Sequence, residues 1–300
     1  MPSDIEREKR ALISLRGVSI GDAFGQCYFM RPEIAEARIA QRTVIAGEWL
    51  YTDDTMMALS VFETLRRFDA IDQQALAHSL ARHYDSKRGY GAAMHEVLDR
   101  IGAGEPWQAV AGSLFGGTGS YGNGSAMRVA PLGAYFADAL PCAIREAERS
   151  AVVTHTHPEA VAGAIAVAVA AAIAANHHDV PPAEFLDQVW QQTPESEVRS
   201  GIRRARGLRE GIAPQHAAAM LGNGSQLSCP DTVPFTLWCA ATFLQNYEEA
   251  LWATVSALGD RDTTCAIVGG IVACSAPDTI PQSWIDATET LPLWALCDLP

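Results

Sequence analysis

Apolar residues recur along most of this chain at spacings of three and four positions, the periodicity of a helix with one buried face. Alternating polar and apolar positions, which would indicate half-buried strands, are scarce. The pattern predicts helices over residues 56–68, 73–83, 91–101, 143–153, 182–192, 195–209 and 234–243. No linker rich in proline, glycine and serine separates these segments, so we predict one compact all-α domain over residues 1–300.

One stretch is apolar on every side. Residues 160–175 are all Ala, Val, Ile or Gly, and the polar residues Glu159 and Asn176 bracket them. A membrane-spanning helix needs about 20 apolar residues, and this run is shorter. We therefore predict a buried central helix whose small side chains let its neighbours approach closely.

The composition argues against several classes of protein. Hydrophobic residues make up 48% of the chain and charged residues 19%, so the chain can form a core and is not disordered. The net charge of −13 lacks the basic footprint of a nucleic-acid-binding protein. Seven cysteines without a Cys-x-x-Cys pair, and a polar N-terminus without the apolar core of a signal peptide, predict reduced thiols and a cytoplasmic location. No membrane or nucleic-acid partner is expected.

Two acidic clusters stand far apart in the chain. The first covers residues 51–55 (Tyr-Thr-Asp-Asp-Thr), and the second covers residues 259–264 (Gly-Asp-Arg-Asp-Thr-Thr). Carboxylate and hydroxyl oxygens grouped in this way suit Mg²⁺, Mn²⁺ or Ca²⁺ rather than zinc. If the fold brings the clusters together, they could hold two such ions, which would polarise oxygens and orient water.

A helix cap is the alternative interpretation of each cluster. Thr-Asp before an apolar run is a common N-cap, whose side chain accepts hydrogen bonds from the first backbone N–H groups. A cap needs only one carboxylate, however, and two uncompensated neighbouring aspartates repel each other. Spacing alone leaves the cap and the metal site both open.

Glycine is concentrated in residues 115–125, where five of eleven positions are Gly. Such a loop lets backbone N–H groups converge on an anion, and residues 126–129 resemble a helix start, where phosphate binds well. Phe115 and Tyr121 offer aromatic faces for a nucleobase. A flexible surface loop is the alternative. The small residues of 17–25 indicate only close packing and a helix C-cap, and Gly-Asn-Gly at 122–124 recurs at 222–224 with different flanks.

These motifs, in this order, resemble the ADP-ribosylglycohydrolase family. The family includes enzymes that remove ADP-ribose from protein arginine or serine, and the glycohydrolase that activates dinitrogenase reductase. The matching motifs are Gly21-Asp22-Ala23-Phe24-Gly25, Thr52-Asp53-Asp54-Thr55, Gly122-Asn123-Gly124, Thr154-His155 and Gly259-Asp260-Arg261-Asp262-Thr263. They extend from about residue 11 to residue 275 with their flanking helices, which is nearly the whole chain.

The resemblance implies an orthogonal all-α bundle with two Mg²⁺ or Mn²⁺ ions in a central cleft. Carried over by position, the metal ligands would be Thr52, Asp53, Asp54, Asp260, Asp262 and Thr263. The ions would hold the distal ribose hydroxyls of ADP-ribose and a water that attacks the anomeric carbon, releasing the protein side chain. Asp53, Asp54 and Asp262 would serve catalysis by stabilising a transition state with oxocarbenium character.

Two further stretches, residues 88–92 and 115–129, are most similar to the serine-linked branch of the family. By that likeness Phe115 and Tyr121 would enclose the adenine. The loop residues would line the diphosphate and His155 would lie by the distal phosphate or ribose. The implied substrate-binding set is Phe115, Gly119, Ser120, Tyr121, Gly122, Asn123, Gly124 and His155.

One position departs from the family pattern. A glutamate that usually follows the Gly-Asp-x-x-Gly motif and supports a metal-bound water is replaced here by Phe29. Glu48 is the substitute that we expect in the catalytic set, with Glu33 or an aspartate as the alternative base. The departure leaves a second function open, that of a weak or inactive ADP-ribose-binding protein acting as an immunity or sensor protein against an ADP-ribosyltransferase. The sequence leaves the oligomeric state open, a monomer included.

Overall fold

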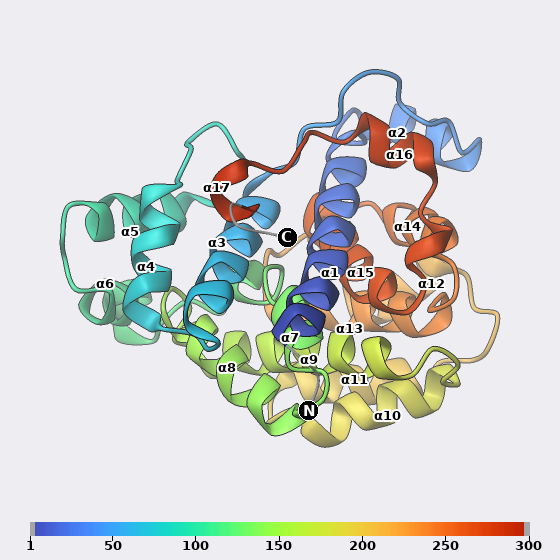
Figure 1. Cartoon of the computed structure of the whole chain (residues 1–300). Helices are drawn as coiled ribbons and strands as arrows, with labels where there is room; N and C mark the ends of the chain where they lie inside the picture. The colour runs from blue at the N-terminus through green and yellow to red at the C-terminus, as the bar shows by residue number, and fades with distance from the viewer. Residues whose placement is uncertain (1–3, 297–300) are drawn as a thin grey trace.

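The computed structural model describes residues 4–296, in which helices joined by loops make up the fold (Figure 1). Within that range no β-strand occurs, only two isolated bridges. The α-helices are α1 (Asp4–Gln26), α2 (Pro32–Ala40), α3 (Asp53–Phe68), α4 (Gln73–Arg82), α5 (Ala92–Gly102), α6 (Trp107–Ser113), α7 (Ala130–Tyr135), α8 (Leu140–Val152), α9 (Pro158–Asn176), α10 (Pro182–Gln192), α11 (Glu197–Arg206), α12 (Pro214–Leu221), α13 (Cys229–Thr242), α14 (Tyr247–Val255), α15 (Arg261–Ser275), α16 (Gln282–Ala287) and α17 (Leu293–Leu296). Three 3-10 helices accompany them: η1 (Leu114–Gly117), η2 (Asn123–Ser125) and η3 (Pro277–Thr279). The predicted all-α fold class is confirmed.

Helices α1 and α15 pack backbone to backbone in the middle of the molecule. Gly17, Gly21 and Gly25 lie four residues apart on the face of α1 that meets α15. A Cβ atom at these positions would lie only 2.4, 2.2 and 2.1 Å from backbone oxygens of α15. The glycines therefore set the distance between the two helices, and they bring the C-terminal half of α1 beside the start of α15.

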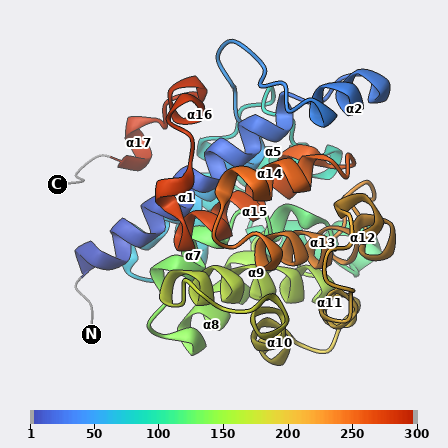
Figure 2. The same cartoon turned by 90° about the vertical axis from the view of Figure 1, so that its right-hand side faces the viewer.

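Helix α9 is apolar on all sides and lies at the centre of a second group of helices. It runs between α7, α13 and α15 on one side and α8, α10 and α11 on the other (Figure 2). Among the described residues it is the one helix long and apolar enough to cross a membrane, yet 78% of its most apolar window is buried inside the molecule. The predicted buried central helix is confirmed by this burial.

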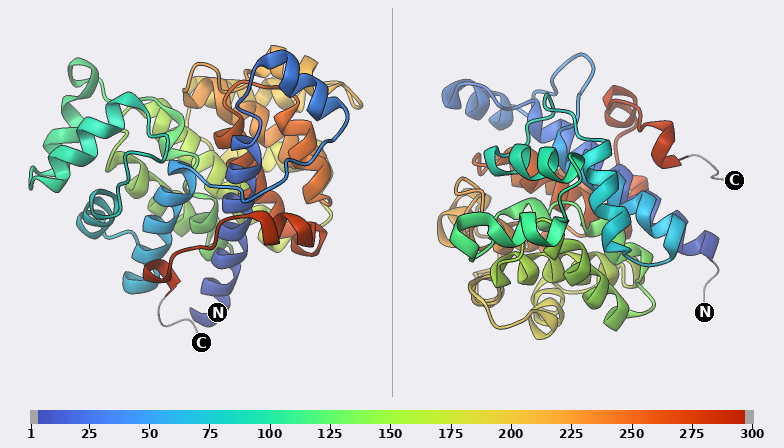
Figure 3. Two further views of the ribbon diagram at one scale, coloured as in Figure 1. Left: turned by 90° about the horizontal axis from the view of Figure 1, so that it is seen from above. Right: turned by 90° about the vertical axis from the view of Figure 1, so that its left-hand side faces the viewer.

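Two parts of the chain lie outside the α1–α15 pair and the helices around α9. Helices α4, α5 and α6 form a group to one side of α3 (Figures 1 and 3). After α15 the chain passes over α1, and α17 lies against α3 (Figure 3). There Arg66 Nη1 donates to the carbonyl of Ala295 at 3.1 Å, and Trp294 stacks on His83 with ring centroids 3.5 Å apart.

Several predicted boundaries need correction. Helix α3 begins at Asp53 rather than at residue 56, so the acidic cluster forms its first turn. Helix α13 begins at Cys229 and continues through Pro234, where the prediction had started the helix. Helix α11 covers fewer residues than the predicted 195–209.

Two interpretations of helix ends were also wrong. Residues 126–129 are not a helix start, because the short helix α7 begins only at Ala130. Residues 17–25 are not a C-cap but the last turns of α1 itself, which extends to Gln26. The close packing expected there is confirmed by the short approaches to α15.

Candidate active site

The N-terminal ends of α3 and α15 meet, and each carries one acidic cluster. Thr52 is the N-cap of α3, and Asp260 is the N-cap of α15. The hydroxyl of Thr263 donates to Asp54 Oδ2 at 3.3 Å, which joins the two clusters. The partial positive charge at a helix N-terminus stabilises nearby carboxylates. The six predicted ligand residues therefore lie together at two adjoining helix ends.

Asp22 of α1 holds the first cluster in place. This fully buried carboxylate accepts hydrogen bonds from the backbone N–H groups of Thr52 and Thr55, at 2.9 and 3.1 Å, and from their hydroxyls, at 2.8 and 2.6 Å. Sequence reasoning gave Asp22 no role, although a lone carboxylate within the small-residue face of an apolar helix was a signal. It fixes the N-terminus of α3 in the way a cap residue would, but from another helix.

Burial and mutual repulsion make the carboxylates of the site hard to ionise together. Burial, followed by the negative charge of Asp22, raises the pKa of Asp53 to about 8. The same two causes hold the pKa of Asp54 well above its usual range. Burial, followed by the charge of Asp260, does so for the pKa of Asp262. Such a cluster needs protons or cations to balance it.

The donor set fits a hard divalent cation. Carboxylates and hydroxyls are the ligands that Mg²⁺ and Mn²⁺ prefer. Asp54 Oδ1 is fully buried and has no hydrogen-bond partner among the described residues, as expected for an oxygen that would face a cation. Within residues 4–296, however, no three His, Cys, Asp or Glu side chains already surround a common metal position. A cation would therefore have to draw the carboxylates closer together.

A cavity of about 370 Å³ extends from the acidic clusters to the glycine-rich loop. Asp53, Asp260, Asp262 and Thr263 line its acidic end. Its other walls include the predicted substrate-binding residues Phe115, Ser120, Tyr121, Gly122, Asn123, Gly124 and His155. A larger cavity of about 650 Å³ lies between α2, α12 and α14 and contains no residue of either cluster. The smaller cavity is thus the one that carries the predicted chemistry.

The glycine-rich loop is tightly packed on one side and exposes its aromatic residues on the other. A Cβ atom at Gly119 would lie 2.1 Å from the Thr156 hydroxyl, and one at Gly124 would lie 2.9 Å from the His155 ring. Phe115 and Tyr121 are 61% and 51% exposed at the cavity. Gly119 packs against Thr156 and does not line the cavity. These contacts hold one side of the loop against the residues around His155, whereas the alternative interpretation was a flexible surface loop.

The hydrogen bonds of His155 determine which face it offers to the cavity. Arg128, fully buried, donates from Nη1 to the Thr154 hydroxyl at 2.9 Å, and this hydroxyl lies 2.7 Å from His155 Nδ1. With one acceptor position of the hydroxyl taken by Arg128, its hydrogen can point at Nδ1. The ring hydrogen is then on Nε2. Burial, followed by the charge of Arg128, lowers the pKa of His155 to about 3, so the ring is neutral.

Both Gly-Asn-Gly triplets contact the second acidic cluster. Asn123 Nδ2 donates to Asp260 Oδ2 at 2.7 Å, and the backbone N–H of Asp260 donates to the carbonyl of Asn223 at 3.1 Å. Gly224 packs on the Asp260 side chain, and its φ of +85° suits glycine. Residues 222–228 also contribute Gln226 and Leu227 to the cavity wall. Sequence reasoning noted the repeated triplet but gave the second one no role.

The expected substitutes for the missing glutamate lie apart from the cavity. Glu48 and Glu33, both within the described chain, are exposed and do not line it. Their role as a base remains a prediction. Phe29 is 48% exposed, and its ring lies 4.9 Å from the guanidinium of Arg261, which donates to the carbonyl of Tyr28 at 2.5 Å.

Comparison with known proteins agrees with this geometry. The family profile described as ADP-ribosylglycohydrolase matches residues 3–299. The chain belongs to the ADP-ribosylglycohydrolase family. A solved structure described as an ADP-ribosylglycohydrolase-related protein complex superposes with a TM-score of 0.63 and 25% identity, covering 95% of this chain and 93% of that chain.

Individual proteins from several organisms are similar to this chain. An uncharacterized protein of Archaeoglobus fulgidus is 32% identical over 248 residues, covering 81% of this chain and 76% of that protein. ADP-ribosylhydrolase ARH3 of Xenopus tropicalis is 28% identical, covering 90% of this chain and 88% of that protein. The human ADP-ribosylhydrolase ARH3 is also 28% identical, covering 80% of this chain and 74% of that protein.

Proposed function

We propose that this protein is a metal-dependent hydrolase that cleaves the glycosidic bond between ADP-ribose and a protein side chain. The observation that carries the proposal is the single cavity with two acidic helix ends at one side and a glycine-rich loop with two exposed aromatics at the other. That arrangement suits a ligand with a sugar to be cleaved, a diphosphate and a base. Membership of the family and similarity to proteins named ADP-ribosylhydrolase support the same reaction.

Two Mg²⁺ or Mn²⁺ ions are the cofactors that we propose. The residues that would hold them are Thr52, Asp53, Asp54, Asp260, Asp262 and Thr263. When bound, such ions orient the attacking water and the ribose hydroxyls and neutralise the clustered carboxylates. The free oxygen of Asp54 and the raised pKa values of Asp53, Asp54 and Asp262 support this assignment.

The other residues bind and orient the substrate. Phe115 and Tyr121 would stack on the adenine, and His155 would donate from Nε2 to an oxygen of the diphosphate or distal ribose. Because burial lowers the pKa of His155 to about 3, the ring would act as a neutral donor. As the bond to the leaving side chain breaks, positive charge develops at the anomeric carbon, and the carboxylates of Asp53, Asp54 and Asp262 would stabilise it.

The test is release of ADP-ribose from arginine-linked and serine-linked ADP-ribosylated peptides, with Mg²⁺ and with EDTA. We expect release from one linkage with Mg²⁺ and none with EDTA. Asp262→Asn should abolish release and weaken Mg²⁺ binding in calorimetry while circular dichroism stays unchanged. Asp138→Asn, which breaks an ion pair with Arg10 at a distance from the cavity, is the control and should keep full activity.

Two outcomes would contradict the proposal. Full activity of Asp262→Asn would refute the proposed two-metal site. Tight ADP-ribose binding without release from either peptide would instead favour the binding protein that acts by occlusion.

A further inference from the structure

The segment that follows α16 is tied to the loop that carries the first acidic cluster, although the two are far apart in sequence. The backbone N–H of Trp49 donates to the carbonyl of Ala287 at 2.7 Å. The N–H of Glu289 donates to the carbonyl of Trp49 at 2.9 Å, and Trp49 and Thr288 form a parallel bridge. These contacts fix the backbone immediately before Tyr51.

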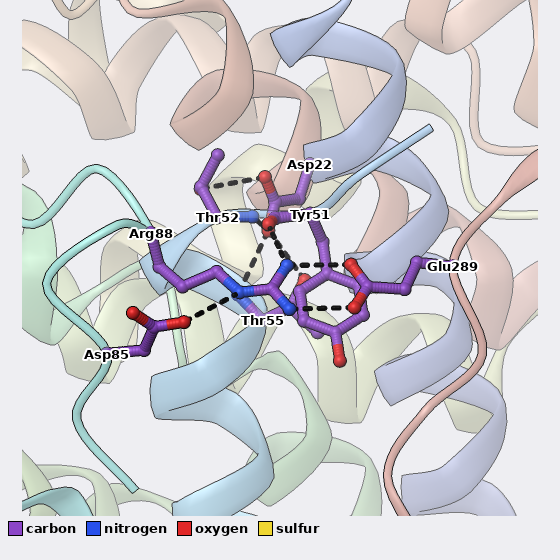
Figure 4. A network of polar contacts seen from close by, with 7 residues as sticks. All are labelled: Asp22, Tyr51, Thr52, Thr55, Asp85, Arg88 and Glu289. Atoms are coloured by element: carbon purple, nitrogen blue, oxygen red, sulfur yellow. Dashed lines mark hydrogen bonds and ion pairs between the residues drawn. The ribbon is translucent and has the colours of Figure 1, made fainter. Parts of the chain in front are cut away.

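A forked ion pair continues this connection. Arg88 donates from Nη1 and Nη2 to the two carboxylate oxygens of Glu289, at 2.6 and 2.7 Å (Figure 4). The same Nη1 donates to the carbonyl of Tyr51 at 2.9 Å, and the guanidinium lies 4.6 Å from the centre of the Tyr51 ring. The two parallel bonds to Glu289 orient the plane of the guanidinium. Glu289 therefore determines where Arg88 contacts Tyr51.

The backbone of Arg88 holds the next part of the cluster. Its carbonyl accepts a hydrogen bond from the N–H of Asp53 at 2.7 Å. Thr52, between the two contacts of Arg88, is bound by the carboxylate of Asp22 (Figure 4). Three consecutive residues that lead into α3, from Tyr51 to Asp53, are thus held, two of them by Arg88.

We propose that Arg88 and Glu289 are positioning residues for the cation site, a role that rests on the proposed function. Both side chains are about one-fifth exposed, at 21% and 22%. An ion pair with that exposure adds little to stability. Its geometric effect is larger, because it holds the segment that presents Asp53 and Asp54. Glu289 thereby acts on the first acidic cluster, which lies much earlier in the chain.

The experiment compares Glu289→Gln with Glu249→Gln. Glu249 forms an equally forked and equally non-local ion pair with Arg42, at 2.5 and 2.6 Å, beside the other cavity. Amide hydrogen exchange of peptides covering residues 49–56 is measured in metal-free protein, and the Mg²⁺ dissociation constant is measured by calorimetry. Arg88→Lys is a second variant, because lysine keeps the charge but cannot form the fork.

We expect Glu289→Gln and Arg88→Lys to accelerate exchange in residues 49–56 and to weaken Mg²⁺ binding by about tenfold or more. Glu249→Gln should change neither quantity. Unchanged exchange in the two variants would overturn the positioning role. If the wild-type protein binds Mg²⁺, an unchanged Mg²⁺ dissociation constant in the variants would overturn it as well. A wild-type protein that binds no Mg²⁺ would refute the proposed function, and exchange alone would then show whether Arg88 and Glu289 hold this segment.

Discussion

Gly25 offers a direct way to displace one acidic cluster relative to the rest of the site. It lies near the end of α1, against the first residues of α15. A Cβ atom at this position would lie 2.1 Å from the carbonyl oxygen of Arg261 and 2.8 Å from the Cα atom of Asp262. Gly25→Ala should therefore move the backbone that carries Asp262 without removing any functional side chain.

The size of the effect follows from these distances. Because real Cβ contacts essentially never fall below 3.0 Å, the two helices must separate by at least about 0.9 Å at this point. Overpacking of this kind costs about 1–3 kcal/mol of the free energy of unfolding. A displacement of about 1 Å at a reacting centre can lower the rate about 100-fold. We expect a loss of activity much larger than the loss of stability alone would cause.

Urea unfolding, Mg²⁺ calorimetry and ADP-ribose release test this prediction together. Gly133→Ala is the matched control, because its Cβ would lie 2.0 Å from the carbonyl oxygen of Ala168 where α7 meets α9. It should cost similar stability but leave Mg²⁺ binding unchanged. Gly112→Ala, with nothing within 4 Å, should lower neither stability nor Mg²⁺ affinity. Gly25→Ala with wild-type Mg²⁺ affinity and turnover, or Gly133→Ala with an equal loss of Mg²⁺ binding, would refute the reasoning.

Two other predictions concern the charge of the site and the adenine contact. Burial raises the folded-state pKa values of Asp22 (to about 6) and Asp53 (to about 8) above the unfolded value of about 3.9. The contribution of these two carboxyl groups to the free energy of unfolding is therefore fully present below about pH 4 and is lost as the pH rises through 6 and 8. Calorimetric Tm values of metal-free protein should fall over this range and Mg²⁺ should restore them most at pH 8; a larger Mg²⁺ effect at pH 5 would contradict this. Tyr121→Ala should weaken ADP-ribose binding by about 1–3 kcal/mol; an unaltered calorimetric dissociation constant would exclude the stack.

Local patterns predicted the helices whose boundaries depend on local chemistry. Helix α10 begins and ends where the periodicity predicted, with Pro182 as its first residue. Helix α13 shows the limit of such reasoning. Proline disfavours a helix interior, yet the helix continues through Pro234 because the preceding turn, including Cys229 and Val233, is buried against other helices. Tertiary packing here outweighs a local preference.

The candidate site divides in the same way. Thr52 and Asp53 could be recognised from sequence because a cap and a metal ligand both require an oxygen-bearing residue before an apolar run. The contacts of Asp22 with Thr52, and of Arg88 with Glu289, join residues that no local pattern relates. Their chemistry is ordinary, and only the packing of α1 and the C-terminal segment brings them to the site.

The hydrogen bonds of Asp22 and Asp54 distinguish two kinds of carboxylate in this site. Asp22 accepts four hydrogen bonds from two residues, three on Oδ2 and one on Oδ1, so both of its oxygens have partners. Asp54 is equally buried, yet only its Oδ2 accepts hydrogen bonds, and Oδ1 has no partner among the described residues. An unpaired buried carboxylate oxygen is costly, and a helix N-terminus contributes only about 0.3–1 kcal/mol against that cost. A bound cation would satisfy the unpaired oxygen of Asp54, whereas both oxygens of Asp22 already accept hydrogen bonds. Asp22 therefore fixes the N-terminus of α3 through its hydrogen bonds, whereas Asp54 keeps a buried oxygen that only a cation or a proton would satisfy.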